Sequence, residues 1–287
     1  MIIIDYSAIA IASIFSQDRP EEIEEGLIRH MILNSIRMYN HKFRSEFGKT
    51  IIACDHRSWR KDVYPQYKAH RKKNRDESPL DWETFFNILA TVRDELVESM
   101  PYPVIHAERA EADDIIGHLV ETTQEFGKNE PVLIVSSDKD FFQLHRYSNV
   151  KQFSPMKKEF VQPGDANFYL FEHICKGDSG DGVPNILSHD DTFVNGDRQR
   201  PLRSSKIQEW YESYNKGMLE NDMDTEVYRN FCRNKRMIDL SHTPKDIREN
   251  IDRIYNEQDF KDNGKVLGYL IEKRCNMLIA NAQDFFI

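Results

Sequence analysis

Residues 131–140 of the chain read Pro131-Val132-Leu133-Ile134-Val135-Ser136-Ser137-Asp138-Lys139-Asp140. The run from Val132 to Val135 is aliphatic and shows no polar alternation, which is typical of a strand buried on both faces of a parallel sheet. Ligands bind at the carboxyl ends of such strands, so two aspartates at that edge are well placed for chemistry. An alternative is that Asp138 or Asp140 caps a helix over residues 140–144.

Two further strands of the same kind are predicted. Ile2-Ile3-Ile4 runs into Asp5, and Thr50-Ile51-Ile52-Ala53-Cys54 runs into Asp55. Helical patterns lie between the strands, at residues 23–36, 82–97 and 111–126, and a short strand is expected at residues 103–105. Asp is a common turn residue, but three Asp-ended strands in a β-α-β order are hard to assign to turns alone. The sequence therefore predicts an α/β fold, with a central, mostly parallel sheet flanked by helices.

The predicted elements change from alternating strands and helices to mainly helices towards the end of the chain. Residues 150–160 read as a short strand pair and residues 168–174 as a helix. After Pro184 the composition becomes more polar, with candidate helices at 207–214, 226–238 and 266–280 and no further buried strand. We therefore expect a catalytic domain over residues 1–183, with a basic region at about 57–80, and a smaller, mainly helical domain over residues 184–287.

Composition limits the classes of protein to consider. The chain has 287 residues, of which 39% are hydrophobic, so it can bury a sizeable core. Its four cysteines are scattered without zinc-site spacing, which indicates a reducing compartment. No apolar run is long enough to cross a membrane, so we expect a cytoplasmic protein. A net charge of -9 argues against a nucleic-acid partner unless the acids gather around metal ions and basic residues cluster elsewhere.

Residues 57–75 form such a basic cluster. The segment contains eight Lys and Arg residues against one acid, with three aromatic residues between them. Lys and Arg neutralise phosphates and aromatic rings stack on unpaired bases, so this composition suits single-stranded nucleic acid. A solvated basic loop is the alternative. The candidate contacts to nucleic acid are Arg57, Arg60, Tyr67, Lys72 and Lys73.

Further acids follow at two places. Glu111, Asp113 and Asp114 lie at the start of a helix, where the helix dipole explains one or two of them but not all three. Residues 177–182 form a glycine-rich loop with two aspartates. The full set cannot converge without counterions, and oxygen donors without His or Cys indicate Mg²⁺ or Mn²⁺. The predicted carboxylates are Asp5, Asp55, Glu111, Asp113, Asp114, Asp138, Asp140, Asp178 and Asp181.

Four short motifs accompany the Asp-ended strands: Tyr67-Lys68-x-x-Arg71, Glu111-Ala112-Asp113-Asp114, Ser137-Asp138-Lys139-Asp140 and Gly177-Asp178-x-x-Asp181. Together with the strands, these motifs resemble those of the 5′-nuclease (flap endonuclease) family over residues 1–184. Within that family the resemblance is to the ribonuclease H subgroup of T4-type phages. The resemblance implies a 5′-nuclease/PIN-like fold and a 5′→3′ exonuclease and flap endonuclease that uses two Mg²⁺ ions, with Mn²⁺ as a substitute. It also implies a helical arch, which matches the basic segment.

The resemblance further implies roles for single residues. Lys68 and Arg71 would contact the scissile phosphate as catalytic groups, and Tyr67 would stack on a base. Asp140, Asp178 and Asp181 would serve the second metal. The residues nearest the first metal would be Asp5, Asp55, Glu111, Asp113, Asp114 and Asp138.

The implied substrates are RNA–DNA hybrids and 5′-flap or nicked DNA duplexes, processed during phage DNA replication in the host cytoplasm. A monomer that works with a single-strand DNA-binding protein is expected. Residues 184–191 lack the repeated glycines of the family's helix-hairpin, which puts a potassium site in doubt.

Two other classes of protein stay open. A haloacid-dehalogenase-type phosphatase needs a second aspartate two residues after the first, where Ser7 stands. A non-catalytic nucleic-acid-binding module would hold metal only for structure.

Overall fold

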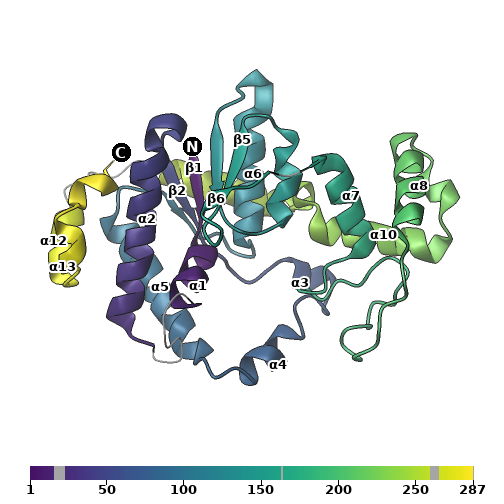
Figure 1. Ribbon diagram of the computed structural model, residues 1–287, viewed down its shortest axis with the longest axis horizontal. Helices are drawn as coiled ribbons and strands as arrows, with labels where there is room; N and C mark the ends of the chain where they lie inside the picture. The colour runs from purple at the N-terminus through teal and green to yellow at the C-terminus, as the bar shows by residue number, and fades with distance from the viewer. Residues whose placement is uncertain (16–22, 163, 259–264, 287) are drawn as a thin grey trace.

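A sheet lies at the centre of the fold (Figure 1). Its six strands follow the order β3-β2-β1-β4-β5-β6. The computed structural model describes residues 1–15, 23–162, 164–258 and 265–286. Strands β1 to β5 are parallel, and β6 runs antiparallel to β5. The strands are β1 (Ile2–Asp5), β2 (Thr50–Ala53), β3 (Val104–Ile105), β4 (Val132–Val135), β5 (Val150–Ser154) and β6 (Glu159–Phe160).

Side chains of the strands alternate between two cores, one on each face of the sheet. Ile3 enters one core while Ile2 and Ile4 enter the other, and all three are fully buried. The core of Ile2 and Ile4 is covered by α1 (Tyr6–Phe15), α2 (Glu25–Phe47), α5 (Trp82–Ser99), α12 (Lys265–Glu272), α13 (Asn276–Ile279) and η4 (Ala282–Phe285). The core of Ile3 is covered by α6 (Ala112–Gln124), η2 (Asp140–Arg146), α7 (Ala166–Lys176), α10 (Thr225–Ile238) and α11 (Lys245–Glu257).

The part of the chain after α7 is helical, as predicted. Helices α8 (Ser204–Asn215), α9 (Leu219–Asp222) and α10 lie at one end of the molecule, whereas α12 and α13 lie at the other (Figure 1). The chain returns by way of η3 (Leu240–His242) and α11, which packs on α6 and β3. At the far end, Asn40 of α2 donates hydrogen bonds to the carbonyl oxygens of Asp284 and Phe286. A domain boundary near Val183 stays a prediction.

The predicted strands and fold class are confirmed. The run that begins at Asp140 is a 3₁₀ helix, and residues 6–15 form a helix, α1, that the sequence analysis did not predict. The sequence reasoning missed α11, and the helix expected at 266–280 is divided into α12 and α13 before Cys275, where Arg274 has a φ of 56°. Within the described ranges, no helix combines the length and apolar character that a bilayer crossing requires.

Candidate metal centre

A cavity of about 1230 Å³ opens at the carboxyl edge of the sheet. Strands β1, β2 and β4 end level with one another there, since Ile4 pairs with Ile52 on one side and with Val135 on the other. The aspartates that follow these strands therefore reach the same space. Of the nine predicted carboxylates, seven line the cavity: Asp5, Asp55, Asp113, Asp138, Asp140, Asp178 and Asp181.

Hydrogen bonds of 2.9–3.1 Å fix the carboxylates at the carboxyl ends of β1 and β4. Asp5 accepts hydrogen bonds from the Ser136 hydroxyl at 2.9 Å and from the backbone N–H of Ala8 at 3.0 Å. The Ser136 oxygen in turn accepts the N–H of Asp138 at 3.1 Å, and Asp138 accepts the N–H of Asp140 at 3.0 Å. Asp138 thus accepts the N–H of the first residue of η2, whose N-cap residue is Lys139, and it still lines the cavity.

Burial and mutual repulsion raise the pKa values of these acids. Burial, with the nearby charge of Asp55, raises the pKa of Asp5 to about 7. Burial and the charge of Asp138 raise the pKa of Asp140 to about 7, and the same causes raise the pKa of Asp113. Each shift shows that the ionised form lacks a sufficient positive partner. The donor set therefore fits hard divalent cations, which supply that charge and bind carboxylate oxygen.

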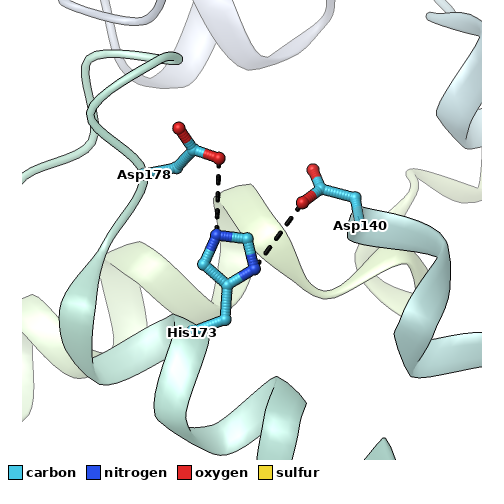
Figure 2. Close-up of side chains that lie close together, drawn as sticks. All are labelled: Asp140, His173 and Asp178. Atoms are coloured by element: carbon cyan, nitrogen blue, oxygen red, sulfur yellow. Dashed lines mark ion pairs between the residues drawn. The ribbon is translucent and has the colours of Figure 1, made fainter. Parts of the chain in front are cut away.

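One histidine belongs to the site as well. Figure 2 shows the His173 ring of α7 between Asp140 and Asp178, with Nε2 at 3.3 Å from Asp178 Oδ2 and Nδ1 at 3.6 Å from Asp140 Oδ1. Ligand atoms of the three residues lie within 4.8 Å of one another, and no second such group of His, Cys, Asp or Glu occurs in the described part of the chain. The sequence reasoning missed His173, because its only signal is its place in the helix that leads into Gly177.

Glu111 lies behind the cavity and does not line it. Burial alone would raise the pKa of Glu111, but Lys68 and Arg60 lower it to about 2. Its partners are Lys68 at 2.5 Å, Ser58 at 2.6 Å, and Tyr67 and Arg60 at 3.0 Å. These groups compensate the negative charge of Glu111 within the protein.

Asp114 also stays outside the cavity. It is fully buried, and its side chain accepts the backbone N–H of Glu111 at 2.9 Å, which completes a capping box at the start of α6. Its other partners are Arg60 at 3.0 Å, Trp59 at 3.1 Å and Thr243 at 2.8 Å. Both carboxylate oxygens are occupied, so the arrangement favours the helix-terminus explanation for this acid.

The basic segment crosses the carboxyl edge between β2 and α5. It contains two short helices, α3 (Arg60–Val63) and α4 (Arg71–Asp76), and sweeps around the lower side of the molecule in Figure 1. Lys68 and Arg71 line the cavity, and both form ion pairs with Asp181. Lys68 has a φ of 56°, and its N–H donates to the Asp181 carbonyl oxygen at 2.7 Å. The backbone of the segment is therefore attached to the loop at 177–182.

Two predicted nucleic-acid contacts need correction. Arg60 and Tyr67 are each only 2% exposed. Arg60 donates to the Met237 carbonyl oxygen at 2.7 Å and pairs with Glu111 and Asp114, while the Tyr67 hydroxyl lies within hydrogen-bonding distance of Asp181. Neither side chain can reach a nucleic acid from this position. Arg57 and Lys72 are exposed, and the side chain of Lys73 lies outside the described residues.

Comparison with known proteins identifies the family. The model for the "5'-3' exonuclease, N-terminal resolvase-like domain" matches residues 1–168, and that for "T4 RNase H, C terminal" matches residues 164–285. This chain belongs to the 5′–3′ exonuclease family. Ribonuclease H of Enterobacteria phage T4 is 34% identical over 99% of this chain and 95% of that protein. Flap endonuclease Xni of Shewanella sp. strain MR-4 is 34% identical over 46% of this chain and 49% of its own length.

Solved structures share the fold of this 5′–3′ exonuclease family member. The T5 D15 protein, co-crystallised with metal ions, has a TM-score of 0.61 at 14% identity and covers 90% of this chain and 97% of its own. A complex of the bacteriophage T5 D15 flap endonuclease with DNA and metal ions has the same TM-score at 15% identity. The protein is therefore an enzyme, a nuclease of the 5′–3′ exonuclease and flap endonuclease type.

The buried position of Arg60 in this nuclease predicts a stability effect. Arg60→Ala leaves Glu111 and Asp114 without their shared guanidinium, and we expect a loss of about 3–5 kcal/mol in the free energy of unfolding, measured with urea. Arg57→Ala is the matched control, because that side chain is exposed in the same segment and pairs only at the surface. Equal free energies of unfolding for the two variants would contradict the role of Arg60 as the buried partner of Glu111 and Asp114.

The raised pKa values predict how the stability of the nuclease depends on pH without metal. The folded protein holds protons on Asp5 and Asp140 up to about pH 7, whereas an unfolded chain loses them near the ordinary value of 3.8. Ionisation therefore costs folding free energy, and stability falls as the pH rises from about 4 through 7. We expect the Tm in EDTA to fall between pH 5 and pH 8, and Mg²⁺ to restore it at pH 8. A Tm that is flat or rises in EDTA would contradict this.

Proposed function

We propose that this protein is a metal-dependent, structure-specific 5′-nuclease that hydrolyses phosphodiester bonds to remove RNA primers and 5′ flaps during phage DNA replication. The observation that carries the proposal is the gathering of seven carboxylates around one cavity, with Lys68 and Arg71 at its rim. Likeness to phage T4 ribonuclease H over nearly the whole chain supports the same substrate class. The substrates are RNA–DNA hybrids and flapped or nicked duplexes.

The same proposal covers the setting in which the enzyme works. It acts as a monomer in the cytoplasm of the host cell, together with a single-strand DNA-binding protein. The relatives from phages T4 and T7 support the host cell as the setting, whereas the monomeric state and the partner protein follow from the family resemblance alone. A phosphatase or a purely structural binding module has no support from the family to which the chain belongs.

The carboxylates would hold two metal ions, with Mg²⁺ as the natural ion and Mn²⁺ as a substitute. Asp5, Asp55, Asp113 and Asp138 would serve one ion, and residues at the edge formed by Asp140 and the loop 177–182 would serve the other. When bound, such ions activate a water molecule and stabilise the leaving oxygen at phosphorus. We assign Glu111 and Asp114 to supporting positions behind these ligands, because other side chains already occupy them.

Lys68 supplies positive charge beside the acids. Burial alone would lower its pKa, but Asp181 and Glu111 raise it above its ordinary value, so Lys68 stays protonated at neutral pH. A cation held at this place can stabilise the charge that develops on a phosphate in the transition state. Arg71 offers a second cation from the same segment. The exposed Arg57 and Lys72 would guide the strand through general contacts to phosphates.

Asp138→Asn tests the proposed function directly. With a 5′-labelled RNA–DNA hybrid and a 5′-flapped duplex, the wild-type protein should release products in Mg²⁺ and none in EDTA. The variant should lose at least ~10²-fold in rate while binding the substrate with nearly unchanged affinity. Asp197→Asn, at an exposed loop position, is the control. Normal cleavage by Asp138→Asn would refute the catalytic assignment.

Lys68→Ala tests the role of the cation. We expect kcat to fall by about 10²–10³-fold and the substrate Kd to change far less, because the cation acts on the transition state. Lys72→Ala is the comparison, and it should weaken binding and lower the salt dependence of log Kd by about one unit while leaving kcat nearly unchanged. Equal losses of rate and affinity in Lys68→Ala would reduce Lys68 to a general phosphate contact.

A further inference from the structure

The function proposed above leaves His173 without a role. This ring lines the cavity, and its Nδ1 atom is buried without any hydrogen-bond partner. The nearest carboxylate oxygen, Oδ1 of Asp140, lies 3.6 Å away, which is too far for a hydrogen bond. A buried ring nitrogen that faces a carboxylate without bonding to it requires an explanation.

The separation of these two atoms matches a shared metal ion. Donor atoms that each lie about 2.0–2.2 Å from one ion are about 3–3.6 Å from each other, depending on the coordination angle. Nδ1 of His173 and Oδ1 of Asp140 are 3.6 Å apart, within that range. Both atoms belong to rigid elements, α7 and η2, which pack closely against each other. An ion between them would need little rearrangement of the backbone.

The other ring nitrogen has the partner that a metal-bound histidine usually has. Nε2 of His173 lies 3.3 Å from Oδ2 of Asp178 (Figure 2). Histidines that bind metal through one nitrogen commonly donate the other N–H to a carboxylate, which fixes the tautomer and the ring orientation. Asp178 is itself held in place, because its Oδ1 accepts the N–H of Asp181 at 3.0 Å and its backbone pairs with Val183 in both directions.

We propose that His173 binds a divalent ion through Nδ1, together with Asp140, and that Asp178 orients the ring through Nε2–H. The inference rests on the proposed function and names a ligand within its second metal site. An imidazole donor favours Mn²⁺, Co²⁺ and Zn²⁺ over Mg²⁺, whereas the carboxylates around Asp5 offer oxygen alone. The two metal positions therefore differ in metal preference.

Pulsed EPR on the untagged, full-length protein with ¹⁵N-labelled histidine and saturating Mn²⁺ tests the ligand directly. We expect coupling between Mn²⁺ and histidine nitrogen in the wild-type protein and in His118→Gln, and its loss in His173→Gln. His118 is the matched control, because it pairs with Asp252 at 2.8 Å with a side-chain exposure of 12%, against 14% for His173, and lies outside the cavity. Absence of nitrogen coupling in the wild-type protein overturns the proposal, whatever the folding of the variants.

Calorimetric titration with Mn²⁺ and with Mg²⁺ tests the metal preference. His173→Gln should lower the affinity for one equivalent of Mn²⁺ by about 10–100-fold and change the affinity for Mg²⁺ far less. Asp178→Asn should lower the affinity for the same equivalent of Mn²⁺ while the coupling between Mn²⁺ and histidine nitrogen is kept. If His173→Gln loses equal affinity for Mn²⁺ and for Mg²⁺, the proposed metal preference is overturned. Cleavage without nitrogen coupling overturns this inference alone, whereas coupling without any cleavage overturns the proposed nuclease function alone.

Discussion

Repulsion among buried carboxylates at one edge of the sheet is the constraint on which the rest of the structure depends. The strands that carry Asp5 and Asp138 are hydrogen-bonded in register and fully buried, so the backbone cannot move to separate the charges. The acids must then be neutralised by protons or by cations. The pKa values of about 7 at Asp5 and Asp140 correspond to neutralisation by protons. Divalent ions would provide neutralisation by cations.

The protein places cations of its own around the same acids. Lys68 and Arg71 reach Asp181 from the basic segment. These groups are positioned by the acids before any substrate arrives. Because such preorganised charges need no rearrangement during reaction, the arrangement suits catalysis at a phosphate. It also explains why an acidic chain can act on nucleic acid: its negative charge is concentrated where positive charge is supplied.

The helical C-terminal part supports the elements that carry the site. Gln143 of η2 donates to the Ile238 carbonyl oxygen at 3.1 Å and accepts the N–H of Leu240 at 3.0 Å. Thr243 donates to Asp114 at the start of α6, at 2.8 Å. Both η2 and α6 thus have their positions fixed by residues 95 to 129 positions later in the chain. This packing gives a structural reason why family likeness extends through both parts of the protein.

The sequence by itself determined the fold class and the edge where chemistry occurs, because buried strands that end in aspartate are local patterns. It could not tell which charged side chains of the basic segment point outward: Lys68 and Arg71 face the cavity, whereas Arg60 is buried against Glu111. The position of His173 in the helix before Gly177 did not reveal its role, because the side chain reaches Asp140 only through the packing of α7 on η2. A side chain's role depends on the direction it faces, and that direction is set by neighbours from distant parts of the chain.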